Sequence, residues 1–291
     1  MNSFHETYRG LLHKCMKGYA EVNARTKTKV MIADGPQSFS VHLGAGLPVA
    51  GNRKYWPHIA AAETAWQFMG TRDPSFILKH APKLWSKFVE QEPGDPLGER
   101  MEEMVDVLKT AYGYRWRKAF GRDQVQLALD ALTADSTNRQ VYLQAWDPRS
   151  DGLGQPDQPK NIPCPIGFSL NVVNNKLNCA VFIRSSDVFV GLPYDVMGYA
   201  LTADAFASSL GITPGVLHVT LAHAHIYEPH FKAVMDCQEG PHKQWTSPRV
   251  PLPAWPIAMI EQSPDAYITQ LKLQSKRADF PEWDPQPIVV E

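Results

Sequence analysis

The chain has 291 residues, of which 44% are hydrophobic and 20% are charged, and its formal net charge is −1. This composition is typical of a globular protein and excludes a disordered or collagen-like chain. Because the charge is close to zero, no field over the whole protein attracts nucleic acid or an acidic membrane, and we predict neither as a partner. Any anionic substrate must therefore be held by a few local arginines.

The sequence carries no signal for export, membrane insertion or disulfide formation. No segment approaches the roughly 20 consecutive apolar residues of a membrane-spanning helix. The chain start, MNSFHETYRG, lacks the apolar core of a secretory signal. The cysteines are widely spaced and form no CxxC pair; they are Cys15, Cys164, Cys179 and Cys237. We therefore expect a cytoplasmic protein without a cysteine-ligated metal.

Helical patterns dominate the first half of the chain. Residues 57–69 begin with a proline, which suits a first helical turn, and stop before Gly70, which suits a helix end. Further helices are predicted at 97–112 and, from the spacing of apolar residues, at 122–133. Residues 139–147 then alternate between polar and apolar side chains, which predicts a strand.

The second half mixes strands with one helix. A long loop rich in Pro, Gly and Asp covers 147–165, and an Asn-Asn turn joins two strands at 166–173 and 177–190. A helix over 197–210 and a strand over 216–227 follow.

Together these elements predict the class of fold. The final segment, FPEWDPQPIVVE, is punctuated by proline and predicts an extended tail. Strands and helices without regular βαβ alternation indicate an α+β fold. Similar strand patterns flank the long loop at 147–165, so we expect a single domain over residues 1–291 without a boundary there.

Cys164 lies between two prolines, in the segment NIPCPIGF, where the long loop meets a predicted strand. Proline restricts the backbone and prevents helix formation, so the thiol is presented rather than packed. The competing interpretation is a small buried hydrophobic side chain, the usual role of a single cysteine. A nucleophilic cysteine also needs a nearby positive charge, and Arg184 supplies one if its strand pairs with the strand after Cys164.

Strand and helix periodicity yield further candidates. The last predicted strand places His223, His225 and Tyr227 on one face, which predicts either a hydrated strand end or a wall that binds a hydroxylated ligand. Glu63 lies on an apolar helix, so it is either an acid–base group whose pKa is raised by burial or an ordinary helix-surface acid. A zinc site of His218, His223, His225 and His230 is disfavoured, because the spacing matches no ligand pattern and His218 points to the opposite face, so we predict no metal site.

Taken in order, these segments resemble those of the thymidylate synthase family, from residue 20 to the end of the chain. The longest similarity is RSSDVFVGLPYDVMGYAL at 184–201, against RSxDxxLGxPFNIAxYAL in the family. Other similar segments are RTKTK (25–29), FSVHLGAGLPV (39–49), ETAWQFMG (63–70), AYGYRWR (111–117, against VYGxQWR), NRQVYLQAWDP (138–148), IPCPIGF (162–168), AHAHIYEPH (222–230) and WDPQP (283–287). The resemblance implies a large mixed β-sheet with flanking helices, and a homodimer whose subunits pack sheet to sheet.

The resemblance also implies a reaction in which a cysteine adds to carbon 6 of a pyrimidine nucleotide and carbon 5 takes a one-carbon unit from 5,10-methylenetetrahydrofolate. The family's catalytic positions correspond to Cys164, Glu63 and Tyr112, with Asp195 at the base. Its nucleotide-binding positions correspond to Arg25, Arg184 and Ser185 at the phosphate, Arg139 from the second subunit, and His225 and Tyr227 at the sugar. Its folate-binding positions correspond to Arg53, Trp85 and Asp187.

The most informative departure from the family pattern is Asp195, which replaces an asparagine. An amide matches the ring N–H and the carbonyl of uracil, whereas cytosine offers a ring nitrogen and an amino group. A protonated carboxyl pairs with neutral cytosine, and a carboxylate pairs with ring-protonated cytosine. Here the chain resembles the cytosine-directed branch of the family, the deoxycytidylate methyltransferases and hydroxymethylases, which predicts dCMP as the substrate; a neutral change of Asn to Asp is the alternative.

Three other departures accompany Asp195. Pro165 replaces the histidine that follows the nucleophile, which removes a polar group near the 4-substituent of the base. Gln140 replaces the second arginine of a pair, so one phosphate contact is missing unless Lys27 or Lys29 replaces it. His223 stands where the family has aspartate, and the sequence offers no account of it.

The nature of the product stays open at this point. The intermediate either takes hydride, giving 5-methyl-dCMP, or takes water, giving 5-hydroxymethyl-dCMP. Trp85 and the DPQP tail resemble methylating enzymes, which favours the methyl product. CMP is an alternative substrate, and an inactive nucleotide- or RNA-binding relative is a further alternative, disfavoured because every catalytic position is present. A cytosine-directed enzyme suggests a nucleoside-antibiotic pathway or a phage that modifies its DNA, in which case the protein acts in the host cytoplasm.

Overall fold

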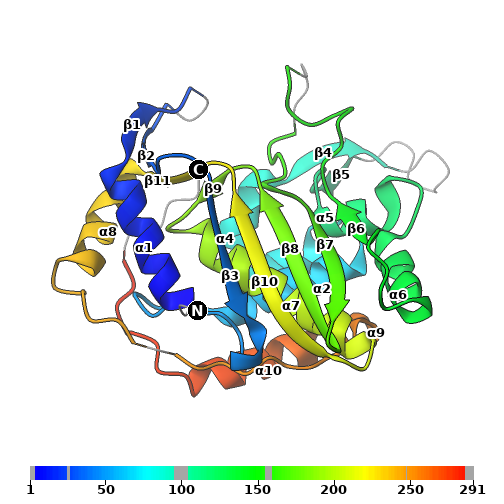
Figure 1. Cartoon of the computed structure of the whole chain (residues 1–291). Coiled ribbons are helices and arrows are strands. Elements are labelled where there is room, and N and C mark those ends of the chain that lie inside the picture. Colours follow the sequence, from blue (N-terminus) through cyan, green and yellow to red (C-terminus); the bar gives the residue numbers. More distant parts are fainter. Residues whose placement is uncertain (1–3, 25–26, 95–103, 155–158, 247, 286–291) are drawn as a thin grey trace.

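The computed structural model describes residues 4–24, 27–94, 104–154, 159–246 and 248–285 (Figure 1). A mixed five-stranded sheet forms its centre, in the spatial order β3-β10-β8-β7-β6. The strands are β3 (Gln37–His42), β6 (Tyr142–Gln144), β7 (Pro165–Val173), β8 (Lys176–Ile183) and β10 (Thr213–Leu221). β10 is parallel to β8, and the other neighbours are antiparallel. The predicted α+β class with a mixed sheet is therefore confirmed.

The inner face of this sheet is apolar. Side chains alternate between the two faces of a strand, and the strand registers align one buried row across all five strands. This row consists of Phe39, Val219, Val181, Phe168 and Leu143. The apolar helix α7 (Gly191–Ser209) packs on this face, and α2 (Pro57–Met69) packs on α7 (Figure 1). The site residues on α2 and α7 are thus fixed by the main core.

The outer face of the same sheet is open to solvent. Its residues include Phe182 and Tyr142, which are 40% and 51% exposed. Small and polar side chains share this face with them, among them Ser40, His218 and Ser169. This face therefore lacks the cover that α7 gives to the inner face.

A second, smaller sheet brings together segments that are distant in sequence. Its order is β1-β2-β11-β9, and helix α1 (Phe4–Lys17) packs on it. The strands are β1 (Tyr19–Val22), β2 (Lys29–Ile32), β9 (Ser186–Asp187) and β11 (Ala224–Tyr227). The continuous strands predicted at 177–190 and 216–227 are therefore wrong in part, because the chain leaves the large sheet after Ile183 and Leu221 and enters the small one.

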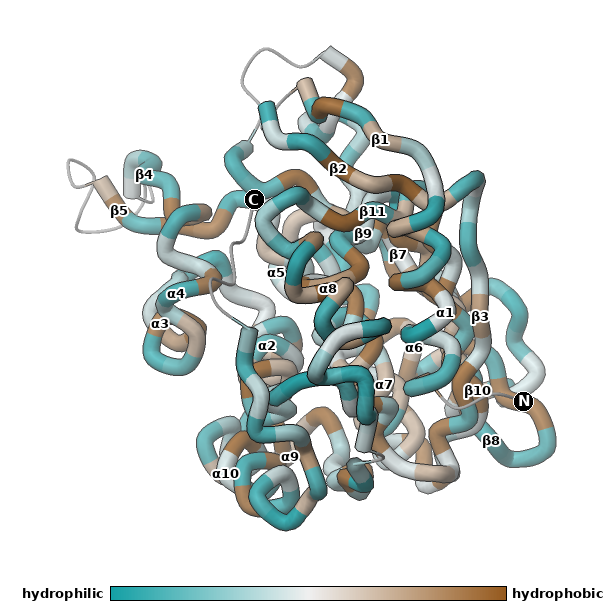
Figure 2. Tube along the Cα trace, turned by 90° about the vertical axis from the view of Figure 1, so that its left-hand side faces the viewer, coloured by the Kyte–Doolittle hydropathy of each residue, from teal (hydrophilic) through white to brown (hydrophobic). Residues whose placement is uncertain are grey.

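The remaining elements surround this framework. They are α3 (Ser75–His80), α4 (Pro82–Trp85), β4 (Glu90–Pro93), β5 (Met104–Val107), α5 (Tyr112–Tyr114), a π-helical segment (Arg115–Ala119), α6 (Gln124–Ala134), α8 (Phe231–Gln238), α9 (Ile257–Gln262) and α10 (Pro264–Lys276); short 3-10 turns cover Leu43–Ala45, Ser86–Phe88 and Glu228–His230. In Figure 2 the β4–β5 hairpin stands away from the body of the molecule. Within the described ranges, no helix combines the length and the apolar character needed to cross a bilayer.

Several local predictions can be compared with these elements. The helices predicted at 57–69 and 122–133 are confirmed, and Asp123 caps the latter by accepting the backbone N–H of Gln126 at 3.0 Å. The helix predicted at 97–112 is wrong over 104–111, because β5 pairs with β4 over Met104–Val107 and a turn follows; residues 97–103 lie outside the described residues.

Other elements have different boundaries from those predicted. The strand predicted at 139–147 is reduced to β6. The helix predicted at 197–210 begins six residues earlier, at Gly191. Ahead of it, one Asp187 carboxylate oxygen accepts the backbone N–H groups of Phe189 and Val190. The hairpin joining β7 and β8 is confirmed, with Asn174 and Asn175 at φ 50° and 57°.

Candidate functional site

Cys164 lies at the junction of the long loop with β7 and is partly exposed. The other three cysteines of the chain, all described, are buried. Burial raises the pKa of Cys15 to about 12 and that of Cys237 to about 11, and it raises the pKa of Cys179 further. Cys164 is therefore the cysteine that a substrate can reach.

Arg184 directly adjoins the Cys164 loop. Its backbone N–H donates to the Cys164 carbonyl at 2.9 Å, which extends the pairing of β7 with β8. Its guanidinium donates through Nε to the Pro163 carbonyl at 2.8 Å and through Nη2 to the Ile162 carbonyl at 3.0 Å. The prediction that strand pairing brings this positive charge to Cys164 is confirmed.

Tyr112, at the start of α5, also contacts Cys164. Its hydroxyl accepts the backbone N–H of Cys164 at 3.4 Å. Burial is the main cause that raises the pKa of Tyr112 well above its ordinary value, and the charges of Cys164 and Asp195 raise it further. Tyr112 thus remains a neutral phenol, whose hydroxyl can donate or accept a hydrogen bond.

Two carboxyl groups face the same region from α2 and α7. Each side chain keeps a small contact with solvent but is surrounded by protein. Burial raises the pKa of Glu63 to about 7, while the indole N–H of Trp85 donates to Glu63 at 2.8 Å and opposes the rise. Burial, followed by the charges of Glu63 and Asp187, raises the pKa of Asp195 to about 8. At neutral pH, Asp195 therefore holds its proton, and Glu63 lies close to its midpoint.

A row of rings lies along β11 and the turn before it. His225 and Tyr227 are each 6% exposed, and their rings meet edge to face at 4.9 Å. Nδ1 of His223 lies 3.2 Å from Nδ1 of His225. One of these two nitrogens must carry a proton while the other accepts it, so His223 influences which tautomer of His225 is present.

The three residues expected at folate differ in their surroundings. Asp187 and Trp85 are partly exposed, and Asp187 lies close enough to Asp195 for its charge to act there. A carboxylate and an aromatic ring suit the polar and flat parts of a pterin. Arg53 is 1% exposed; it donates to the Phe189 carbonyl at 3.1 Å and lies over the Tyr55 ring at 4.2 Å. In this conformation the Arg53 side chain is enclosed by protein.

The remaining predicted residues lie at the edges of this region. Ser185 is partly exposed between β8 and β9. Arg139 is exposed in the loop before β6. Arg25 falls outside the described residues. The roles assigned to all these side chains by resemblance stay predictions.

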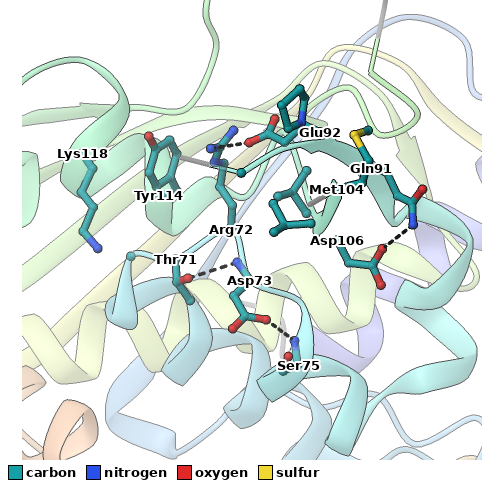
Figure 3. A pocket seen from close by; sticks show the side chains of 15 residues that line it. Thr71, Arg72, Asp73, Ser75, Gln91, Glu92, Met104, Asp106, Tyr114 and Lys118 are labelled. Atoms are coloured by element: carbon teal, nitrogen blue, oxygen red, sulfur yellow. Dashed lines mark hydrogen bonds and ion pairs between the residues drawn. The ribbon is translucent and has the colours of Figure 1, made fainter. Parts of the chain in front are cut away.

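A separate hollow of about 970 Å³ lies between the end of α2 and the β4–β5 hairpin (Figure 3). Arg72 pairs there with Glu92 at 2.5 Å and lies over the ring of Tyr114. None of the predicted site residues lines it. Among the described residues, no group of three or more His, Cys, Asp or Glu side chains is arranged to hold a metal ion.

The sequence reasoning missed a buried ion pair between Arg115 and Asp151. The available signal was AYGYRWR itself, in which Arg115 replaces the glutamine of the family pattern. Asp151 carried no signal, because it lies in a loop rich in acidic and small residues.

Comparison with known proteins identifies the family. The sequence model described as thymidylate synthase matches residues 6–272. The thymidylate synthase of Wigglesworthia glossinidia brevipalpis is 29% identical over 229 residues, which is 77% of this chain and 79% of that protein. That of Corynebacterium aurimucosum is 27% identical over 234 residues, 79% of this chain and 80% of that protein. The chain therefore belongs to the thymidylate synthase family, whose members transfer a one-carbon unit from methylenetetrahydrofolate to carbon 5 of a pyrimidine nucleotide.

Proposed function

We propose that this enzyme transfers a one-carbon unit from 5,10-methylenetetrahydrofolate to carbon 5 of dCMP, giving 5-methyl-dCMP. The observation that carries the proposal is Asp195, a recessed carboxyl with a pKa of about 8 where the family has asparagine. The protonated carboxyl donates to the ring nitrogen of cytosine and accepts from its amino group.

The proton on Asp195 accounts for the preference for cytosine over uracil. Because this carboxyl is already protonated at neutral pH, binding of neutral cytosine requires no proton uptake. The carbonyl of uracil is a much weaker base than the ring nitrogen of cytosine, so it accepts a weaker hydrogen bond from the protonated carboxyl. An ionised Asp195 would face the uracil carbonyl lone pair to lone pair, whereas cytosine protonated at its ring nitrogen would offer that carboxylate two donors. A mispaired buried polar group costs about 1–3 kcal/mol.

The residues around Cys164 support covalent catalysis. The sulfur adds to carbon 6 of the ring, which makes carbon 5 nucleophilic. The nearby guanidinium of Arg184 favours the thiolate. Tyr112 helps to remove the proton from carbon 5, and Glu63, with its pKa of about 7, relays protons at the ring. Arg25, Arg184 and Ser185 bind the phosphate.

The aromatic residues around Trp85 favour a methyl product. Methylenetetrahydrofolate supplies the one-carbon unit and the hydride that completes a methyl group. The Trp85 ring packs edge to face against Trp66 at 5.2 Å and Phe88 at 6.0 Å. This apolar wall beside Glu63 excludes water, which favours the methyl over the hydroxymethyl product. Asp187 binds the pterin, and Arg53 positions Phe189 behind it. His225 and Tyr227 bind the sugar hydroxyl.

The open face of the large sheet supports a homodimer. Phe182 and Tyr142 are large exposed side chains on that face, and a second copy packed there would bury both. Arg139 is exposed beside the same edge strand, β6, from which it reaches the phosphate site of the partner. An arginine supplied in this way makes the dimer necessary for activity.

One assay tests the proposal. The enzyme is incubated with methylenetetrahydrofolate and, separately, with dCMP, CMP or dUMP, and the product mass and dihydrofolate absorbance are recorded. We expect dCMP to gain a methyl group with equimolar dihydrofolate. A hydroxymethyl product without dihydrofolate would overturn the assignment of a methyl product. A preference for CMP would overturn the assignment of the sugar, and a preference for dUMP would overturn the assignment of the base. No turnover of any nucleotide would point to an inactive relative.

A further inference from the structure

Arg115 and Asp151 form an ion pair that is almost completely withdrawn from solvent, with exposed fractions of 5% and 0%. Nη2 of Arg115 donates to one carboxylate oxygen of Asp151 at 2.9 Å, and Nη1 donates to the other. Nη1 also donates to the Ala145 carbonyl at 2.6 Å. The pair therefore joins the π-helical segment to the long loop that leads to Cys164.

Such a pair is weak evidence for stability, because the loss of hydration offsets much of the attraction between the charges. Its geometry is better suited to fixing one conformation of the turn at 147–151. The planar guanidinium matches both carboxylate oxygens, which defines orientation as well as distance. We infer that Arg115 and Asp151 are positioning residues that fix the backbone of residues 162–164, which presents the Cys164 thiol; this inference rests on the proposed nucleophilic role of this cysteine.

Asp151 holds a tight turn through two hydrogen bonds to Asp147. Its carboxylate accepts the backbone N–H of Asp147 at 2.8 Å, and its own N–H donates to the Asp147 carbonyl at 2.9 Å. Gly152, at φ 61°, lies so close to Trp146 that an added Cβ would be 3.0 Å from the indole ring. The turn thereby fixes the Trp146 ring.

Trp146 in turn contacts the residue that holds the nucleophile loop. The guanidinium of Arg184 lies 5.7 Å from the centre of the Trp146 ring. The same guanidinium donates to the carbonyls of Ile162 and Pro163, immediately before Cys164. A displaced turn would therefore shift Arg184 and, with it, the backbone that presents the thiol.

Arg115 is connected to Cys164 by a second route, through Tyr112. It follows Tyr112 by three positions, and the hydroxyl of Tyr112 accepts the backbone N–H of Cys164. The π-helical turn that starts at Arg115 is a rare backbone form that occurs often at functional sites. Both partners of the ion pair are thus connected to Cys164 by separate routes.

The test uses Arg115→Gln, Asp151→Asn and the double variant of the full-length enzyme. Two readouts are measured: kcat with dCMP, and the pH profile of Cys164 alkylation by iodoacetamide, which needs no nucleotide. Tyr112, Arg184 and Asp195, the titratable groups around the thiol, are unchanged in every variant. We expect each single change to lower kcat by about 10- to 100-fold, as small misplacements of reacting groups do. The alkylation profile should shift as well.

The double variant provides the rescue, since glutamine and asparagine form a neutral hydrogen-bonded pair with no unpaired charge. Asp204→Asn is the matched control: Asp204 is another buried carboxylate that accepts a backbone N–H, from Ala254 at 2.8 Å. It should change thermal stability but neither readout. Asp151→Asn, which keeps its hydrogen-bond acceptor, covers the case in which Arg115→Gln does not fold.

The inference is overturned if the single variants lose thermal stability but keep the wild-type kcat or alkylation profile, or if the control changes the readouts equally. Activity in Cys164→Ser would instead overturn the proposed function. The two failures are distinguishable, because alkylation reports the thiol without turnover.

Discussion

Replacing Asp195 by asparagine restores the family's side chain at the base and should reverse the preference between cytosine and uracil. The structure sets the size of the effect. Asp195 has a pKa of about 8 and faces Glu63 within the protein, so its contacts with the base edge are made away from bulk water. Two contacts change, and each mispaired buried group costs about 1–3 kcal/mol.

The sum of about 2–6 kcal/mol corresponds to a change of about 30- to 10⁴-fold in the ratio of kcat/KM for dCMP to that for dUMP. Competition between the two nucleotides at equal concentration, with the products separated by mass, measures this ratio directly. Asp204→Asn makes the same chemical change further along α7, at a carboxyl that accepts the Ala254 N–H, and should leave the ratio unchanged. An Asp195→Asn enzyme that still prefers dCMP as strongly as the wild type would refute the base assignment.

Three further predictions follow from the site and the hairpin. The proton on Asp195 is present below its pKa of about 8. The affinity for dCMP, measured by calorimetry, should therefore be constant near neutral pH and weaken about tenfold per pH unit above that pKa. A similar decline of affinity in Asp195→Asn would contradict this. Glutamine at position 63 cannot relay protons, so Glu63→Gln should lower kcat by about 10²–10⁴-fold and leave the dCMP dissociation constant nearly unchanged. Near wild-type turnover in this variant would exclude Glu63 from proton transfer. Asn174 and Asn175 both have positive φ, so alanine at either position should lower the free energy of unfolding by about 1 kcal/mol in chemical denaturation, whereas Asn175→Gly should have little effect.

The surroundings of Cys164 were predictable from sequence because they depend on a short turn. The Asn174-Asn175 turn fixes the register of β7 against β8, and Arg184 then falls beside Cys164. The family resemblance supplied the same neighbours independently. The hairpin pattern and the family resemblance therefore led to the same prediction for the neighbours of Cys164.

Other features depend on partners that a local pattern does not reveal. The alternation that predicted one strand over 216–227 continues through His223, but periodicity identifies faces and not the neighbouring strand, so the change of sheet was missed. Met104–Val107 became a strand because β4 pairs with it. Arg115 and Asp151 are 36 positions apart, and no repeat or spacing links them.

The central claim is that the Cys164 sulfur bonds to a cytosine ring, and trapping that bond tests it most directly. The enzyme is incubated with 5-fluoro-dCMP and methylenetetrahydrofolate, denatured, digested and examined by mass spectrometry. Fluorine at carbon 5 cannot leave as a proton does, so the covalent complex should accumulate on the peptide that contains Cys164 and be absent from Cys164→Ser. An unmodified Cys164 peptide, or an adduct that forms only with 5-fluoro-dUMP, would contradict the account.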